Sequence, residues 1–270
     1  MTEQGVHQWL HRAWRRLSNI VRYGLGPAAR ERKQADKARR RDTGFFEGER
    51  WQHDQGGARR RYASYDEYVE HQSAKLGEIL PRLHETREDD LAEFKRRFET
   101  CPQLGAARNV LCLGARIGTE VRALHALGHF AIGIDLNPGA DNRYVLPGDF
   151  HAIVFPDGSV DAIYSNALDH AFDLDKVLAE VRRLLRPGGL FVLDVLDGYE
   201  EEGGFVPGEY EAMMWRDHKG FLERIADLSG FVLETVRDLG HTRRDHWTQA
   251  VLRKPQPAAA PARAAVSAEA

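Results

Sequence analysis

The 270-residue chain is poor in cysteine and has no long apolar run. Its two cysteines, Cys101 and Cys112, offer neither a disulfide framework nor the paired spacing of a metal site, and its twelve histidines are scattered. The longest apolar runs, such as residues 190–193, are far too short to cross a bilayer. At the N-terminus the arginines lie within the apolar periodicity rather than before it, unlike a signal peptide. We therefore expect a cytoplasmic protein without a metal centre.

The chain also lacks a strong net charge, but its charges are unevenly distributed. Residues 1–61 contain fifteen Lys and Arg against seven Asp and Glu, so the remainder carries -11 within a total of -3. This contrast predicts that residues 1–61 form a basic extension with properties of its own. The length alone allows one large domain or two small ones.

Within this extension, apolar residues recur at helical spacing while arginines occupy the other face; the apolar positions are Val6, Trp9, Leu10, Ala13, Trp14, Leu17, Ile20 and Val21. Such a helix either lies on an anionic membrane surface or packs onto this protein or a twin subunit. Peripheral membrane contact is therefore one expectation, and the oligomeric state is not predicted. The highly charged residues 29–46 indicate a solvated helix or linker. Because no recognised binding motif accompanies them, we do not expect a nucleic-acid partner.

Residues 62–105 predict a helical cap made of two helices, over residues 64–80 and 86–99. Ser64 followed by Glu67 forms a capping box at the start of the first helix. Pro81 is expected to separate the two helices, because proline lacks the N–H that a helix interior requires.

From residue 106 to 254 the pattern alternates between strands and helices. This alternation predicts an α/β fold, a doubly wound, Rossmann-like and mostly parallel seven-stranded sheet that carries the N-terminal helical extension. The expected strands are residues 110–113, 131–134, 162–164, 190–195, 232–236 and 249–252, and the expected helices are residues 119–127, 174–185 and 218–228. Residues 255–270, rich in Ala and Pro, are expected to form a disordered tail.

The stretch NVLCLGARIGTEVRAL, from Asn109 to Leu124, reads as a strand, a glycine turn and a helix. Gly114 and Gly118 bracket the turn, but Arg116 stands between them, so the dinucleotide motif G-x-G-x-x-G is not intact. Asp135 ends the next strand twenty-one residues after Gly114, where a carboxylate can accept hydrogen bonds from ribose hydroxyls. Its alternative role is to cap the turn that follows. Position and residue type favour ribose binding.

Residues 109–195 resemble the class I S-adenosylmethionine-dependent methyltransferases, in a variant branch with the motifs G-A-R-x-G-x-E-V, G-D-F-H and S-N-x-x-D-H. The resemblance implies S-adenosylmethionine as the cofactor and assigns roles by position. Gly114 and Gly118 would line its methionine and ribose portions, and Asp135 would hold the ribose hydroxyls. The remaining assignments are Asp149 on the exocyclic amine of adenine, Phe150 over the ring, and Ser165 and Asn166 near the transferred methyl group.

Two residues depart from the family pattern. The family's usual acidic residue before the first glycine is Cys112 here, and its middle glycine is Arg116. A guanidinium at position 116 can bind the α-carboxylate of the cofactor in a bidentate manner. Alternatively, Arg116 pairs with Glu120 at i, i+4 and steadies the first turn of the helix. The sequence does not separate these two interpretations.

The segment SNALDHAFD places Asp169 and His170 just beyond the fourth strand, as catalytic candidates. A neutral imidazole suits removal of a proton from a hydroxyl acceptor at neutral pH. His170 alternatively caps a helix or packs against the cofactor, and His151 is a weaker candidate base.

The acceptor is expected to be a small molecule, sugar or lipid-linked intermediate methylated on oxygen, since the chain lacks the N-P-P-[YF] motif of enzymes that methylate amino groups of nucleic acids and proteins. The helix bearing His71, Gln72 and Lys75 and the segment 198–218 are expected to select it. A catalytically inactive cofactor-binding or scaffold protein is the alternative function. A nicotinamide dehydrogenase is disfavoured by the missing glycine motif.

Overall fold

The computed structural model describes residues 50–54, 56–201, 204, 207–242 and 245–257. The predicted amphipathic helix, the charged segment 29–46 and residues 258–270 of the predicted tail lie outside the described residues. The membrane and tail predictions therefore stay predictions. No helix in the described ranges is both long and apolar enough to cross a membrane.

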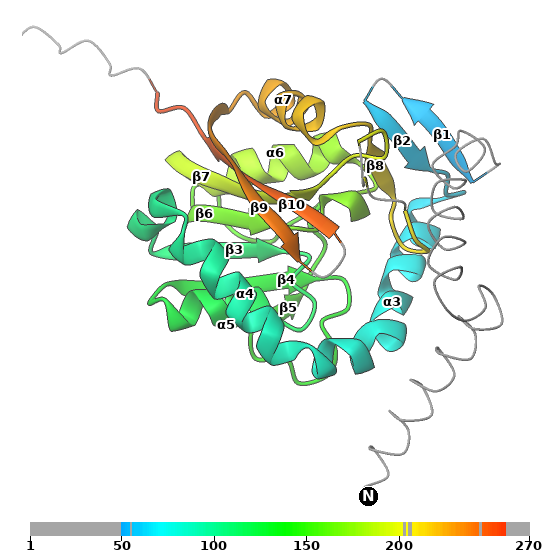
Figure 1. The fold of residues 1–270 in the computed structure, drawn as a ribbon, viewed down its shortest axis with the longest axis horizontal. Helices are drawn as coiled ribbons and strands as arrows, with labels where there is room; N and C mark the ends of the chain where they lie inside the picture. Colours follow the sequence, from blue (N-terminus) through cyan, green and yellow to red (C-terminus); the bar gives the residue numbers. More distant parts are fainter. Residues whose placement is uncertain (1–49, 55, 202–203, 205–206, 243–244, 258–270) are drawn as a thin grey trace, which may run out of the picture.

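A seven-stranded sheet forms the centre of the molecule, in the order β5-β4-β3-β6-β7-β10-β9 (Figure 1). The strands β3 to β7 pair in parallel, and β10 pairs antiparallel with both β7 and β9. The predicted fold class is confirmed. The strand bounds are β3 Asn109–Leu113, β4 Phe130–Asp135, β5 Val145–Pro147, β6 Val160–Ser165, β7 Leu185–Leu196, β9 Val232–Thr242 and β10 Asp245–Arg253.

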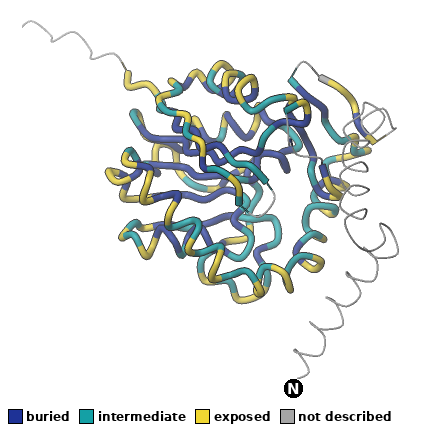
Figure 2. Tube along the Cα trace, viewed as in Figure 1, coloured by how far each residue is buried: buried dark blue, intermediate teal, exposed yellow. Residues whose placement is uncertain are grey.

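Helices cover both faces of this sheet, and alternate residues along β3 face different layers. Leu111 and Leu113 pack with α6 (Leu174–Leu184) and α7 (His218–Ser229), whereas Val110 and Cys112 pack with α4 (Arg87–Glu99) and α5 (Thr119–Ala126). Figure 2 shows the buried strands between the more exposed helices. Cys112 is fully buried, as expected of a small apolar residue inside a strand.

The helix α3 (Tyr65–Glu85) runs through Pro81, so the prediction that Pro81 ends it is wrong. The helix breaks at Thr86, after which α4 begins. Ser64 caps the helix as predicted, because its Oγ accepts a hydrogen bond from the backbone N–H of Glu67. The Glu67 carboxylate accepts its hydrogen bond from the N–H of Ala63, one residue before the cap, and not from Ser64. Pro81 is exposed, and the helix continues through it to Glu85.

A second, three-stranded sheet joins the N-terminal segment to a distant part of the chain. The hairpin of β1 (Trp51–Asp54) and β2 (Gly57–Arg60) pairs with β8 (Met213–Trp215). The predicted boundary at residue 61 is therefore wrong for residues 51–60, which belong to the folded body. Strands of three or four residues carry too little periodicity to be recognised in a sequence.

The strand order reverses at β3, whose two neighbours β4 and β6 lie on opposite sides. In doubly wound sheets, ligands bind in the crevice beyond the carboxyl ends of the strands at such a point. In Figure 1, α3 lies alongside these strand ends and the segment containing β8 lies next to it. The topology thus positions the loop after β3, the end of β4 and α3 around one crevice.

Candidate functional site

The loop between β3 and α5 has three residues with positive φ: Gly114 (67°), Arg116 (48°) and Gly118 (77°). Gly114 is required because a Cβ there would lie 2.6 Å from the Cβ of Ala167. Gly118 is required because its Cβ would lie 2.8 Å from that of Tyr144. Arg116 holds a conformation that few side chains adopt without strain. The loop is therefore a tight turn that brings bare backbone to the edge of the sheet.

Asp135, the last residue of β4, fixes this loop through its carboxylate. Its Oδ2 accepts a hydrogen bond from the Arg116 backbone N–H (2.8 Å), and its Oδ1 accepts one from the Asn137 N–H (2.9 Å). Burial raises the pKa of Asp135, although these two hydrogen bonds oppose the shift. Each oxygen retains a further lone pair for a ligand hydroxyl.

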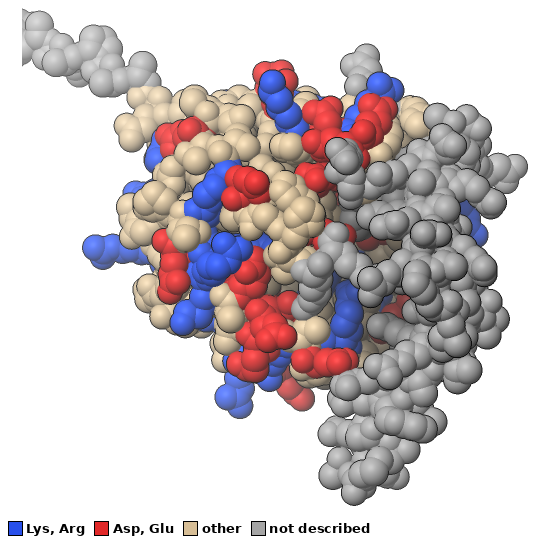
Figure 3. Space-filling view, viewed as in Figure 1, with Lys and Arg blue, Asp and Glu red and all other residues tan. Residues whose placement is uncertain are grey.

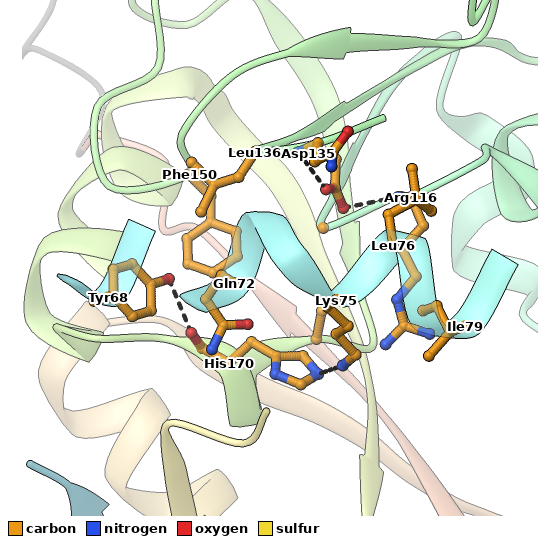
Figure 4. A pocket seen from close by; sticks show the side chains of 13 residues that line it. Tyr68, Gln72, Lys75, Leu76, Ile79, Arg116, Asp135, Leu136, Phe150 and His170 are labelled. Atoms are coloured by element: carbon orange, nitrogen blue, oxygen red, sulfur yellow. Dashed lines mark hydrogen bonds between the residues drawn. The ribbon is translucent and has the colours of Figure 1, made fainter. Parts of the chain in front are cut away.

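Two connected cavities lie at this edge of the sheet. The narrower one, about 50 Å³, is lined mainly by apolar side chains, with Asp135 and Gly114 at its rim (Figure 4). The larger one, about 780 Å³, extends toward α4, β10 and the loop before β8. The two form one cleft, because both are bordered by Lys75, Ile79, Gly114, Arg116 and His170. The larger cavity falls within the range of about 300–1,000 Å³ typical of small-molecule sites.

The helix α3 covers the narrower cavity and is tied to three other segments. Tyr68 Oη donates to the His170 carbonyl (2.9 Å), Gln72 Nε2 donates to the Tyr210 carbonyl (2.7 Å), and the Ser73 carbonyl accepts from Asn137 Nδ2 (2.7 Å). Leu76 and Ile79 of the same helix line the cavity.

Seven of the ten predicted site residues line the cleft: Gly114, Arg116, Asp135, Phe150, Asn166, Asp169 and His170. Gly118, Asp149 and Ser165 do not line either cavity. Gly118 caps α5, and the buried Ser165 hydroxyl bonds within the backbone at the end of β6. The ligand roles of all ten residues stay predictions, and seven of them share one cleft.

Asp149 lies outside the cavity lining because its carboxylate is held by other side chains. Its Oδ2 accepts a short hydrogen bond from the Tyr65 hydroxyl, and its Oδ1 accepts from the backbone N–H and the Nδ1 of His151, both at 2.8 Å. Burial alone would raise the pKa of Asp149, but the hydrogen bonds from His151 and Tyr65 outweigh it and lower the pKa. Its predicted contact with adenine stays a prediction.

His151 has no nitrogen available as a base. Its Nε2 accepts hydrogen bonds from the backbone N–H groups of Phe172 and Asp173, each at 3.2 Å, which places the ring proton on Nδ1. This histidine therefore anchors the chain that follows β6.

His170 is held between a carbonyl and a lysine from α3. Its Nδ1 lies 2.9 Å from the Tyr210 carbonyl and can only donate to it, so the neutral ring has its lone pair on Nε2. Lys75 Nζ lies 2.5 Å from this Nε2 (Figure 4). Burial and the charge of Lys75 lower the pKa of His170 well below its usual value, and burial together with the Arg116 guanidinium lowers the pKa of Lys75 to about 7. Lys75 therefore titrates near neutral pH, whereas the lowered pKa keeps His170 neutral as a hydrogen-bond acceptor for the amine.

Two carboxylates lie beside this pair. Asp169 Oδ2 is 3.6 Å from His170 Nε2, and Glu211 lies close enough that its charge adds to the effect of burial, raising the pKa of Asp169 to about 7. Asp169, His170 and Glu211 present their ligand atoms within 4.8 Å of one another, a spacing that a metal ion could use. Lys75 Nζ, 2.5 Å from His170 Nε2, already contacts the imidazole nitrogen that faces this cluster.

The predicted alternative in which Arg116 pairs with Glu120 is not formed. Among the described residues no ion pair or side-chain hydrogen bond joins them, although both line the larger cavity. Glu120 was not predicted as a site residue, and neither were Tyr68 and Glu211. Only the G-x-E spacing after the glycine turn could have drawn attention to Glu120.

Acidic and basic side chains are mixed over the described part of the face shown in Figure 3, which includes α4 and the β9–β10 hairpin. No stripe of one sign runs across the coloured atoms of this view. That distribution does not support a nucleic-acid surface on this face of the described chain.

Residues 111–193 match the family model described as "Methyltransferase domain". Over these residues the chain is similar to a methyltransferase domain. The matched residues run from within β3 to within β7 and include the glycine turn, Asp135 and His170, whereas α3, α4 and the segments around Tyr210 and Trp247, which also line the cleft, lie outside the match. The agreement between this match and the position of the cleft supports the resemblance seen in the sequence.

Curated relatives are similar to this domain over part of their length. The chain is 45% identical over 94 residues to the sterol 24-C-methyltransferase ERG6B of Gibberella zeae, covering 34% of this chain and 24% of that protein. It is 35% identical over 97 residues to malonyl-(acyl-carrier protein) O-methyltransferase 1 of Coxiella burnetii, covering 33% and 34%. The chain thus spans about a quarter to a third of the length of these relatives.

Among solved structures, the fold is similar to the 1,6-didemethyltoxoflavin-N1-methyltransferase of Burkholderia thailandensis, solved with its substrate and S-adenosylhomocysteine. The TM-score is 0.59 at 17% identity, covering 76% of this chain and 99% of that one. At this identity the similarity establishes the methyltransferase fold and nothing finer.

Proposed function

We propose that the protein is an S-adenosylmethionine-dependent methyltransferase acting on a hydroxyl group of a small molecule, sugar or lipid-linked intermediate. The observation that carries the proposal is the position of Asp135. Its carboxylate ends β4 at the point where the strand order reverses, faces the cavity, and is fixed by the N–H of Arg116 on the glycine turn. This arrangement suits a ribose, and the matched family model covers the same residues.

The other residues of the cleft fit the remaining parts of such a cofactor. Phe150, Leu136 and Leu76 give the narrow cavity an apolar lining suited to a purine, and Gly114 leaves the backbone bare beside it. The larger cavity contains charged groups suited to an amino-acid end and to an acceptor. The cofactor supplies a methyl group activated by a sulfonium, so positioning of the acceptor provides much of the rate acceleration.

His170 and Lys75 would take the proton of a hydroxyl acceptor. His170 Nδ1 is fixed by the Tyr210 carbonyl, so Nε2 orients the Lys75 amine by accepting its hydrogen bond. With a pKa lowered to about 7, that amine is partly neutral at physiological pH and can accept a proton. Asp169 stands beside the pair and can stabilise the ammonium that results.

The proposed acceptor atom is argued from the cleft and not from the relatives. The relatives named above are a sterol 24-C-methyltransferase and a malonyl-(acyl-carrier protein) O-methyltransferase, so they favour no single acceptor atom. A proton-accepting pair in the cleft favours oxygen, because a hydroxyl must lose its proton to be methylated at a useful rate.

The experiment is a transfer assay with S-adenosylmethionine labelled on its methyl group. The purified protein is incubated with fractions of a cell extract, and labelled products are identified by mass spectrometry. The proposal expects a labelled small molecule with the wild type and none with Asp135→Ala. Absence of binding to S-adenosylhomocysteine would contradict it.

A catalytically inactive cofactor-binding protein is the second candidate. This candidate is favoured by the distance of 2.5 Å between Lys75 Nζ and His170 Nε2, because the contact occupies the imidazole nitrogen that would act as the base predicted from the sequence. Tight binding of S-adenosylhomocysteine without transfer to any fraction would support this second candidate.

A further inference from the structure

One end of the larger cavity is bordered by Lys75, Asp169, His170, Tyr210 and Glu211. We call it the acceptor end, because it contains the lysine and histidine that would act on the acceptor. Carboxylate oxygens of Asp169 and Glu211 lie within 4.8 Å of one another there. Lys75 is the one lysine or arginine among these five residues, so a negative charge is left over even when its amine is protonated.

Asp169 is only 7% exposed, yet no other residue of the described chain gives its carboxylate a hydrogen bond. Its basic neighbour, His170 Nε2, is 3.6 Å away, and the lowered pKa of that ring keeps it neutral. Burial, followed by the charge of Glu211, raises the pKa of Asp169 to about 7. The charges of Lys75 and Arg116 oppose this shift without cancelling it. Because a buried carboxylate without a partner is costly, this position points to a ligand that brings a positive charge.

Glu211 is held at the same place without being neutralised. One of its carboxylate oxygens accepts a hydrogen bond from the Gly208 N–H. Arg60 of β2 fixes the loop through its backbone, since Nε donates to the Glu211 carbonyl (2.8 Å) and Nη2 donates to the Gly208 carbonyl (2.9 Å). The guanidinium thus binds carbonyl groups of the loop, and the carboxylate of Glu211 stays available to a ligand.

An ammonium group suits this position better than a metal ion does. Asp169, His170 and Glu211 have the spacing of metal ligands, but both imidazole nitrogens of His170 are already in use. Nδ1 bonds to the Tyr210 carbonyl, and Nε2 lies 2.5 Å from Lys75 Nζ. Two carboxylates remain, and an ammonium needs only such hydrogen-bond acceptors.

The rest of the larger cavity is unsuited to an apolar acceptor. Seven acidic and four basic side chains border it, against a few apolar ones such as Leu83 and Leu196. A sterol body or a long acyl chain that filled this space would strip water from those charges, which is costly. The cavity therefore favours a small water-soluble molecule.

We propose that the acceptor is a water-soluble small molecule of the amino-sugar or amino-alcohol class, whose ammonium group binds Asp169 and Glu211 while its hydroxyl group faces Lys75. This inference rests on the proposed function. The charges of the two carboxylates favour the protonated form of Lys75 in the empty site. A bound ammonium offsets those charges, so the amine of Lys75 loses its proton more easily and becomes able to accept the proton of the hydroxyl.

The first test extends the transfer assay with S-adenosylmethionine labelled on its methyl group. The cell extract is divided into chloroform-soluble and water-soluble fractions, each is incubated with the wild-type protein, and the remaining S-adenosylmethionine is removed on charcoal. The labelled product is expected in the water-soluble fraction, retained on a cation exchanger at pH 7 and methylated on oxygen by mass spectrometry.

Label in the chloroform-soluble fraction, or a water-soluble product that passes through the exchanger, overturns the inference while leaving the proposed function intact. A labelled product from neither fraction overturns the proposed function itself. Because this test uses only the wild type, it does not depend on how any variant folds.

The second test uses Glu211→Gln, with the acceptor taken from the fraction that the exchanger retains. The KM for this acceptor is expected to rise by about 10- to 100-fold, as for the loss of a hydrogen bond between charged groups. The affinity for S-adenosylhomocysteine, measured by calorimetry, is expected to stay within about twofold. Glu209→Gln is the matched control, because Glu209 borders the same cavity but is exposed, and both values should stay within about twofold.

An unchanged KM in Glu211→Gln overturns the ammonium site. A tenfold or larger loss of affinity for S-adenosylhomocysteine in a folded Glu211→Gln protein also overturns it, because Glu211 would then serve the cofactor instead of the acceptor.

Discussion

Arg97 of α4 and Asp194 of β7 form a buried ion pair, with Arg97 Nη1 3.0 Å from Asp194 Oδ2. The Asp194 carboxylate also accepts hydrogen bonds from Tyr164 Oη and Gln249 Nε2, both at 2.8 Å. The pair therefore connects α4 to three neighbouring strands of the sheet, and α4 borders the larger cavity.

Asp194→Ala is expected to destabilise the protein by about 3–5 kcal/mol, because it removes the buried carboxylate that Arg97, Tyr164 and Gln249 share and leaves Arg97 only Glu93 as an acidic partner. The free energy of unfolding from urea titration measures this. Glu223→Ala is the control, since it breaks the exposed pair with Lys219 and is expected to cost less than about 1 kcal/mol. A similar decrease in the free energy of unfolding in both variants would show that the buried Arg97–Asp194 pair stabilises the fold no more than an exposed pair does.

The carboxylate of Glu93 makes the free energy of unfolding depend on pH. Hydrogen bonds from Arg96, and also from Arg97 and Thr242, lower its pKa from 4.5 to about 2, against the effect of burial. Because the folded pKa is depressed, its contribution to stability is present above about pH 4.5 and is lost as the pH falls toward 2. The difference in unfolding free energy between wild type and Glu93→Gln should therefore shrink between pH 6 and pH 3. A difference that is constant over this range would refute the assignment.

Asp135→Ala is expected to weaken the binding of S-adenosylhomocysteine by about 1–3 kcal/mol, through the loss of a charged acceptor for the ribose. Calorimetry measures the affinity, and thermal unfolding shows whether the glycine turn that Asp135 fixes is intact. Asp135→Asn, which keeps one acceptor oxygen, should lose less. An unchanged dissociation constant in a folded Asp135→Ala protein would rule out ribose binding by this residue.

His170→Ala and Lys75→Met are each expected to slow methyl transfer by about 10²- to 10⁴-fold, once the acceptor is known, because Lys75 would take the proton and His170 would orient its amine. The affinity for S-adenosylhomocysteine should change little. Since residues that act as a unit are non-additive, the double variant should be no slower than the slower single variant. If the rate reduction of the double variant equals the product of the two single reductions, the two residues act independently.

The parallel sheet and its flanking helices could be predicted because their apolar patterns are long and regular. Residues 110–113 fall within β3, and residues 174–185 match α6 to within one residue. The short strands β1, β2, β5 and β8 were not predicted, because three or four residues form no period. Pro81 misled the prediction of α3 because its local effect on a helix is outweighed here by the contacts of the residues around it.

The part of the cleft that could be predicted is the part whose residues belong to one contiguous sequence motif. Asp135 and Arg116 were found because both belong to the pattern of strand, glycine turn and next strand. The contact between Lys75 and His170 joins residues 95 positions apart, and that between Tyr65 and Asp149 joins residues 84 apart. Only the packing of α3 across the sheet edge creates these pairs, and no spacing in a single sequence encodes them.

The hairpin of β1 and β2 reaches the site through the loop before β8. Arg60 Nε donates to the Glu211 carbonyl (2.8 Å), and the next residue, Ala212, donates its N–H to the Asp169 carbonyl (2.8 Å). A protein shortened to begin at residue 62 would strip away the strand that backs this loop and loosen the groups that border the larger cavity. A shortened chain must therefore keep the hairpin of β1 and β2, and substitutions in this hairpin can change the shape of the larger cavity without replacing any residue that lines it.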